Sequence, residues 1–125
     1  MSLYEEMKAE FVFQDNRGRL TQLTHQDWQQ VNVLESHQGT VRGGHYHKRV
    51  REAFFVITGS VCLRLRSVCG QEDAEEQTFH TGAFFLVPPY TAHSMFFPED
   101  CVLVALYDKS VEDEDGVKDI WPEEV

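Results

Sequence analysis

The sequence is poor in basic residues and contains no long apolar run. Eleven Lys and Arg residues stand against 21 Asp and Glu residues, which gives a formal net charge of −10. This charge argues against nucleic acid and anionic membranes as partners, because both are polyanions. No stretch approaches the ~18 consecutive apolar residues of a membrane span. The acidic start of the chain also lacks the basic and apolar regions of a signal peptide.

Cysteine is equally scarce. Cys62, Cys69 and Cys101 are odd in number, and none of them forms a C-x-x-C pair. This usage indicates reduced thiols rather than a disulfide framework, so we expect a cytoplasmic protein.

What the chain does contain is a series of short β-strand patterns. Val61, Leu63 and Leu65 alternate with polar or small residues, which is typical of a strand with one buried face. The apolar runs at 54–57, 84–87 and 101–106 suit strands that are buried on both faces. Many short strands separated by turns predict an all-β sandwich or barrel. The 125 residues, 42% of them hydrophobic, suffice for one core, so we predict a single domain over 1–125 with its barrel at about 10–108.

Two segments carry potential metal ligands. His45 and His47 are spaced i, i+2, which on a strand directs both imidazoles to the same face. Glu52 follows after a short basic turn, and His93 comes from a separate predicted strand. Imidazole nitrogens with one carboxylate suit a divalent transition metal such as zinc, nickel, manganese or iron. So few protein ligands would leave positions open for water or substrate.

These residues carry a resemblance to the cupin family. The first cupin motif, G(X)5HXH(X)3-4E(X)6G, is matched from Gly39 to Gly59 at every spacing. The second motif, G(X)5PXG(X)2H(X)3N, is matched at Gly82, Pro88 and His93, but Tyr90 replaces its glycine and Phe97 its asparagine. The resemblance implies a cupin fold, which is a double-stranded β-helix or jelly-roll barrel. It also implies that His45, His47, Glu52 and His93 bind the metal.

A looser resemblance points to sugar nucleotides. Residues 41–48 are similar to the V-R-G-x-H-x-H-K segment of 3,4-ketoisomerases acting on thymidine-diphosphate 4-keto-6-deoxyhexoses, and 87–93 resemble their I-P-P-x-x-W-H segment. Residues 15–20 resemble the D-x-R-G-x-L opening of that family. The cupin domain of capsular-sugar epimerising reductases is more similar around the first motif, because it also places a glutamate after the histidines.

Basic residues cluster beside the predicted metal ligands. Four of the eleven lie within residues 42–51, and Arg42, Lys48 and Arg49 are candidates to bind a diphosphate. Balancing nearby surface carboxylates is the alternative role. Strand parity directs Arg42 away from the face of His45 unless a bulge at 43–44 re-aims it. Tyr90, three residues before His93, is a further candidate for substrate contact.

These patterns leave three functions open. The first is isomerisation or epimerisation of a nucleotide-linked keto-sugar through an enediolate, with the metal as Lewis acid. Without metal, His47 or His45 would act as the general base. The second is an iron-dependent dioxygenase of a small molecule, and the third is a ligand-binding cupin without turnover.

The two ends of the chain predict peripheral segments. By analogy with other cupins we expect a homodimer, with residues 11–13 as the strand that two copies would exchange. The acidic end, residues 112–125, predicts a solvated surface segment that closes with a short helical turn.

Overall fold

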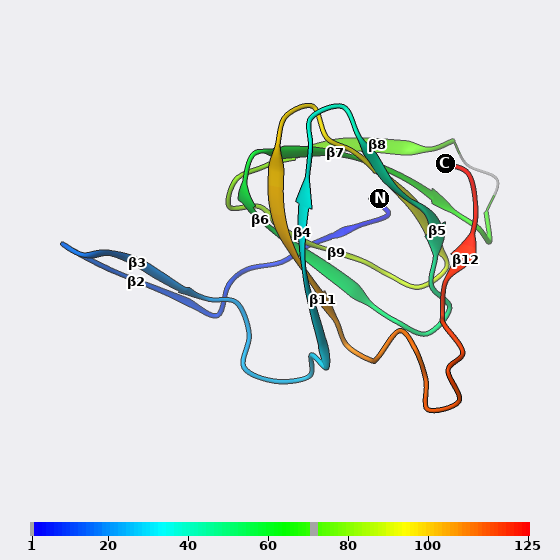
Figure 1. Ribbon diagram of the computed structural model, residues 1–125, viewed down its shortest axis with the longest axis horizontal. Helices are drawn as coiled ribbons and strands as arrows, with labels where there is room; N and C mark the ends of the chain where they lie inside the picture. Colours follow the sequence, from blue (N-terminus) through cyan, green and yellow to red (C-terminus); the bar gives the residue numbers. More distant parts are fainter. Residues whose placement is uncertain (1, 71–72) are drawn as a thin grey trace.

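The computed structural model describes residues 2–70 and 73–125, and these residues form strands and turns without a helix. Ten strands build two five-stranded antiparallel sheets, and two more form a separate hairpin (Figure 1). No helix of the described residues could therefore span a membrane.

Each sheet combines strands that are distant in sequence. The first has the order β1 (Glu5–Glu6), β9 (Phe84–Val87), β6 (Glu52–Thr58), β11 (Cys101–Tyr107), β4 (Gln30–Ser36). The second has the order β12 (Trp121–Pro122), β5 (Val41–Tyr46), β10 (Thr91–Phe96), β7 (Ser60–Ser67), β8 (Glu75–His80). The hairpin pairs β2 (Phe11–Asp15) with β3 (Gly18–Gln22).

The space between the sheets is filled by apolar side chains. Val61, Leu63 and Leu65 of β7 are all 0% exposed, which confirms the alternation predicted for this strand. Phe85 stacks on Phe79 with ring centroids 3.8 Å apart. Burying a side chain of this size contributes about 1.5–3 kcal/mol. The predicted all-β cupin barrel is thereby confirmed.

Two tight turns explain where the cupin motifs need glycine. Gly59 joins β6 to β7 with φ +85°, and a Cβ there would lie 2.2 Å from the Asp100 carbonyl oxygen. Tyr90 occupies the glycine position of the second motif with φ +61°, a left-handed conformation that glycine adopts without strain. Phe97, at the asparagine position, is 0% exposed and packs in the core instead of making polar contacts.

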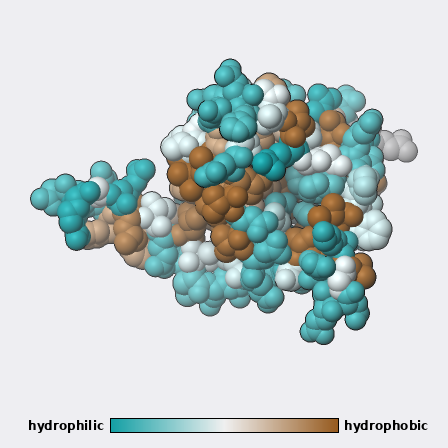
Figure 2. All heavy atoms as spheres, viewed as in Figure 1, coloured by the Kyte–Doolittle hydropathy of each residue, from teal (hydrophilic) through white to brown (hydrophobic). Residues whose placement is uncertain are grey.

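The β2–β3 hairpin projects from the barrel (Figure 1). Its large apolar side chains are about half exposed: Phe11 47%, Val12 53%, Phe13 53% and Leu20 55%. Figure 2 shows brown, apolar side chains along the hairpin behind a hydrophilic tip. The barrel edge adds further exposed apolar residues, with Val31 and Val33 on β4 at 59% and 63%.

The acidic end of the chain differs from the prediction. Instead of a helical turn, it forms an isolated bridge between Glu112 and Lys118 and then β12, which pairs with β5. The red segment in Figure 1 runs along the barrel beside β5. Asp119 within this segment is only 3% exposed, so the segment is partly docked rather than solvated throughout.

Candidate metal centre

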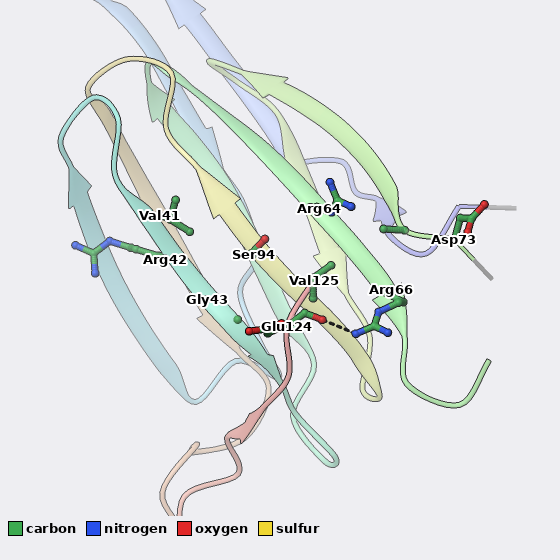
Figure 3. A pocket seen from close by; sticks show the side chains of 11 residues that line it. Val41, Arg42, Gly43, Arg64, Arg66, Asp73, Ser94, Glu124 and Val125 are labelled. Carbon is green, nitrogen blue, oxygen red and sulfur yellow. Dashed lines mark hydrogen bonds between the residues drawn. The ribbon is translucent and has the colours of Figure 1, made fainter. Parts of the chain in front are cut away.

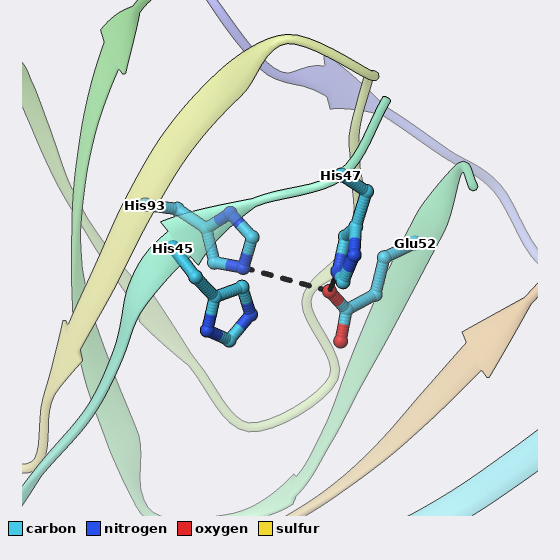
Figure 4. A group of neighbouring side chains, drawn as sticks. All are labelled: His45, His47, Glu52 and His93. Carbon is cyan, nitrogen blue, oxygen red and sulfur yellow. Dashed lines mark hydrogen bonds and ion pairs between the residues drawn. The ribbon is translucent and has the colours of Figure 1, made fainter. Parts of the chain in front are cut away.

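Four ligand-type side chains converge inside the barrel (Figure 4). His45 comes from β5, His47 follows directly after that strand, Glu52 opens β6, and His93 lies on β10. One donor atom from each residue lies within 4.8 Å of all the others. β5 and β10 are paired with His45 opposite His93, so the sheet register itself brings the two cupin motifs together.

Glu52 stands at the centre of this cluster. Its Oε1 lies 3.0 Å from His47 Nε2 and 3.5 Å from His93 Nε2. Glu52, His47 and His93 are 4%, 4% and 1% exposed, whereas His45 is half-buried. The cluster is therefore shielded from solvent and reached past His45.

Burial and mutual charge shift the pKa values of the cluster. Burial lowers the pKa of His45 to about 4, reinforced by the neighbouring His93 and His47. Burial would also lower the pKa of His47, but the hydrogen bond to Glu52 outweighs it and raises that pKa. Burial would raise the pKa of Glu52, yet the hydrogen bonds from His47 and His93 hold it at about 2. The raised pKa of His47 and the lowered pKa of Glu52 both favour a buried ion pair between them, beside a His45 whose lowered pKa favours the neutral form.

The donor set fits a divalent transition metal. Ligands bound about 2.1 Å from one ion lie within roughly 4.2 Å of each other, so the four donors need only a slight contraction. His47 Nδ1 lies 2.5 Å from the main-chain carbonyl oxygen of Asp119, which can only accept, so Nδ1 carries the proton. Nε2 is the atom that faces Glu52, and it offers a lone pair to a metal once its own proton is displaced.

The cluster opens into a chamber of about 230 Å³ lined by residues of β4 and β5, among others. Its polar lining includes Gln30 and Asn32 of β4 and the buried Tyr107 of β11. Burial raises the pKa of the Tyr107 phenol, and the charge of Glu52 raises it further, so the phenol keeps its proton. Sequence analysis did not identify these three residues, because no motif marks them and only strand pairing brings them to the histidines.

Arg42 reaches the chamber because β5 is bulged. The register with β10 shifts so that His93 faces His45 while Ser94 faces Gly43, and Gly44 is the extra residue. Gly43 has φ +93°, and a Cβ there would lie 2.7 Å from the His93 carbonyl oxygen, so glycine is required. The bulge re-aims Arg42 into the chamber lining, where its Nε donates to Ser36 Oγ at 2.8 Å.

The other residues predicted to bind substrate lie outside the chamber lining. Lys48 Nζ sits 3.7 Å above the Trp121 ring. Arg49 is exposed, and its main-chain N–H is bonded to Asp119. Tyr90 is 42% exposed and packs near Tyr46, with ring centroids 6.1 Å apart. Their part in substrate binding stays a prediction.

A larger cavity of about 740 Å³ lies elsewhere, on the outer face of the second sheet (Figure 3). Two of its three arginines are paired with carboxylates: Arg64 with Glu76 at 3.6 Å and Arg66 with Glu123 at 2.9 Å. In Figure 3 the Arg42 side chain points away from this group, toward β4. Arg42 thus borders both cavities, but the larger cavity does not reach the histidines.

Several solved structures share this fold. The QdtA 3,4-ketoisomerase of Thermoanaerobacterium thermosaccharolyticum, crystallised as a double mutant with TDP, is 25% identical, with a TM-score of 0.71 over 90% of this chain and 83% of that one. The dTDP-4-dehydrorhamnose 3,5-epimerase of Sulfolobus tokodaii is 18% identical, with a TM-score of 0.72 over 92% and 80% of the two chains. The capsular polysaccharide assembling protein CapF of Staphylococcus aureus is 24% identical, with a TM-score of 0.70 over 92% of this chain but 34% of CapF.

No curated protein sequence matched the chain. Residues 13–114 match the family described as the polysaccharide biosynthesis C-terminal domain. This match covers most of the barrel, including both cupin motifs and all four donors. The chain therefore belongs to the polysaccharide biosynthesis C-terminal domain family.

Proposed function

We propose that this protein is a cytoplasmic metal-binding cupin that isomerises or epimerises a nucleotide-linked keto-sugar in polysaccharide or deoxysugar biosynthesis. The observation that carries the proposal is the convergence of four metal-type donors beside a chamber that Arg42 borders. Family membership supports the biosynthetic context. The QdtA ketoisomerase, which binds TDP, supports the substrate class.

Arg42 is suited to anchor the anionic part of such a substrate. Its hydrogen bonds go to two neutral acceptors, Ser36 Oγ and the Glu35 carbonyl oxygen. Within residues 2–70 and 73–125 no carboxylate pairs with it, in contrast to Arg17, Arg64 and Arg66. Its positive charge is thus available at the mouth of the chamber, and a guanidinium binds phosphate oxygens in a bidentate manner.

In both reactions a base removes a proton from a carbon beside the carbonyl group. In an isomerisation an enediolate forms, a proton returns to the former carbonyl carbon, and the hydroxyl proton moves to the other oxygen; in an epimerisation the proton returns to the same carbon on the opposite face. A bound divalent metal would supply Lewis-acid stabilisation of the developing oxyanion. His45, His47, Glu52 and His93 would hold it, so they would not serve as free bases. Among the described lining residues this leaves Tyr107 as a protonated phenol beside the cluster.

If the site works without metal, the assignment of the base changes. His45 is neutral because its pKa is about 4, and it is the most accessible of the three histidines. His47 is paired with Glu52 and tends to stay protonated. His45 would then be the group positioned to accept a proton, and His47 the group positioned to donate one.

Metal content is the first test. We expect near-stoichiometric metal in protein purified without a metal-affinity column, measured by elemental mass spectrometry, and a large loss in Glu52→Gln. Glu35→Gln, which changes an exposed carboxylate on β4, is the matched control and should keep its metal. Metal-free wild-type protein would contradict the metal part of the proposal.

Turnover separates the alternative functions. The metal-loaded protein should isomerise or epimerise TDP-4-keto-6-deoxyglucose, the ligand of another QdtA crystal structure, as followed by NMR. Dioxygen uptake with ferrous iron and a small organic substrate would instead favour the dioxygenase, and binding without turnover would favour the ligand-binding cupin.

Arg42 allows a test of the substrate class. Arg42→Gln should weaken TDP binding by roughly 10-fold or more, since one charge-assisted hydrogen bond contributes about 1.5–3 kcal/mol. Arg49→Gln, seven residues away in the same basic cluster but outside the chamber lining, is the control. Equal losses in both variants, measured by calorimetry, would show that the diphosphate does not enter at Arg42.

We further propose a homodimer. The apolar side chains of β2–β3 are exposed in the single chain, and an isolated two-stranded hairpin is only marginally stable in water. A second copy that covers Phe11, Val12 and Phe13 would remove this exposure.

A further inference from the structure

The environment of Asp119 is unusual for a residue so near the acidic end of the chain. Its carboxylate is buried and accepts four hydrogen bonds from N–H groups. The main-chain N–H groups of Lys48, Arg49 and Val50 lie 2.9, 2.8 and 3.0 Å from it. The indole N–H of Trp121 donates the fourth bond at 3.0 Å.

The loop that this carboxylate binds joins two of the four metal-type donors. Residues 48–50 lie between His47 and Glu52, so the position of this loop sets the separation of the two side chains. A turn whose three successive N–H groups all point at one carboxylate has little freedom to rearrange, because each unpaired buried N–H would cost about 1–3 kcal/mol.

The same residue also holds the imidazole of His47. The main-chain carbonyl oxygen of Asp119 accepts from His47 Nδ1 at 2.5 Å. One residue of the tail therefore orients a ring by its backbone and the following loop by its side chain. Its own N–H donates to the Val111 carbonyl oxygen at 2.9 Å, which ties it to the start of the tail.

We propose that Asp119 is a positioning residue of the metal centre, setting the tautomer of His47 and the spacing between His47 and Glu52. This inference rests on the proposed metal-binding function. Asp119 does not touch the metal position itself; it acts through His47 and the 48–50 loop. It also lies beyond residue 114, where the family match ends.

The physical consequence is a preorganised site. Outer hydrogen bonds of this kind fix the ring orientation of a metal-ligating histidine, and their loss typically costs 10–100-fold in metal affinity. In Asp119→Asn, one of the two oxygen positions becomes an NH2 group. Oδ1 accepts from Lys48 and Trp121 and Oδ2 from Arg49 and Val50, so in either orientation two N–H donors would face another donor.

The test measures zinc and cobalt affinity of the metal-free full chain by competition with a chromophoric chelator. We expect Asp119→Asn to bind 10–100-fold more weakly than wild type, and its cobalt absorption bands to shift at saturation. Asp113→Asn is the matched control, because this exposed tail aspartate also accepts two main-chain N–H bonds, from Asp115 and Val117, both at 2.9 Å. It should bind as wild type does.

The outcomes are distinguishable. If wild type binds metal and Asp119→Asn binds it equally well with the same cobalt spectrum, the inference is wrong and the proposed function stands. If wild type itself binds no metal, the proposed function fails first. Should Asp119→Asn not fold without metal, Trp121→Phe removes one of the four hydrogen bonds, and an unchanged affinity in that variant would overturn the inference.

Discussion

The two peripheral segments of this chain behave in opposite ways. The β2–β3 hairpin is rich in large apolar side chains, yet it projects from the barrel with Phe13 and Leu20 about half exposed. The C-terminal tail is acidic, yet Asp119 is buried and β12 extends the second sheet. Apolar content alone therefore does not decide which segment docks onto its own barrel. In the tail, one carboxylate matches several main-chain N–H groups, and this match outweighs the cost of burying its charge.

The largest expected difference between the two segments is the loss of stability when each is deleted. Ending the chain at Lys118 removes Asp119 and β12, and we expect it to lower the free energy of unfolding by about 3–5 kcal/mol, because the main-chain N–H groups of residues 48–50 and His47 Nδ1 lose their acceptors. Replacing residues 11–21 by a short Gly-Ser linker should cost under about 1 kcal/mol. Urea unfolding of both variants measures the difference, and equal losses would contradict it.

Acid should undo the docking of the tail selectively. The pKa of Asp119 would rise by burial, but the N–H donors of Lys48, Arg49 and Trp121 hold it at about 2, below the ordinary 3.8. A lowered folded-state pKa gives stability that is complete above pH ~4 and lost as pH falls toward 2. We expect wild type to lose about 2 kcal/mol more than Asp119→Asn between pH 5 and pH 2.

The measurement is a pH series of urea unfolding curves for the two proteins. The pKa of Glu52 is lowered as well, but Glu52 is present in both proteins. The difference between their curves therefore reports on Asp119 alone. If the unfolding free energies of the two proteins change equally with pH over this range, the hydrogen bonds from the loop to the Asp119 carboxylate contribute nothing to stability.

The smallest expected effect on stability comes from a substitution in the hairpin. Phe13→Ser should change the unfolding free energy of the barrel by less than about 0.5 kcal/mol, since the side chain is already 53% exposed. It should nevertheless weaken the proposed homodimer, as seen by sedimentation velocity over a range of concentrations. Leu20→Ser in β3 should act alike, whereas an unchanged mass distribution in both variants would remove the hairpin from the interface.

Much of the candidate metal centre could be predicted from the sequence because its residues lie in two short motifs. The spacing of His45, His47 and Glu52 follows from strand geometry and one turn. The two adjacent glycines at 43–44 also allowed a bulge that re-aims Arg42 to be predicted as an alternative. Tyr107 could not be found in this way. It ends an apolar run, and nothing in that run indicates that the folded chain places the tyrosine beside the histidines.

Local patterns thus determined the strands, the cupin barrel and the four donors, because each depends on residues a few positions apart. Only the tertiary structure decided how the ends of the chain are used. Asp119 and the loop it binds are about 70 residues apart in sequence. An aspartate in an acidic tail resembles any solvated one in sequence. What distinguishes Asp119 is the set of main-chain N–H groups that the loop between β5 and β6 directs at its carboxylate in the folded barrel.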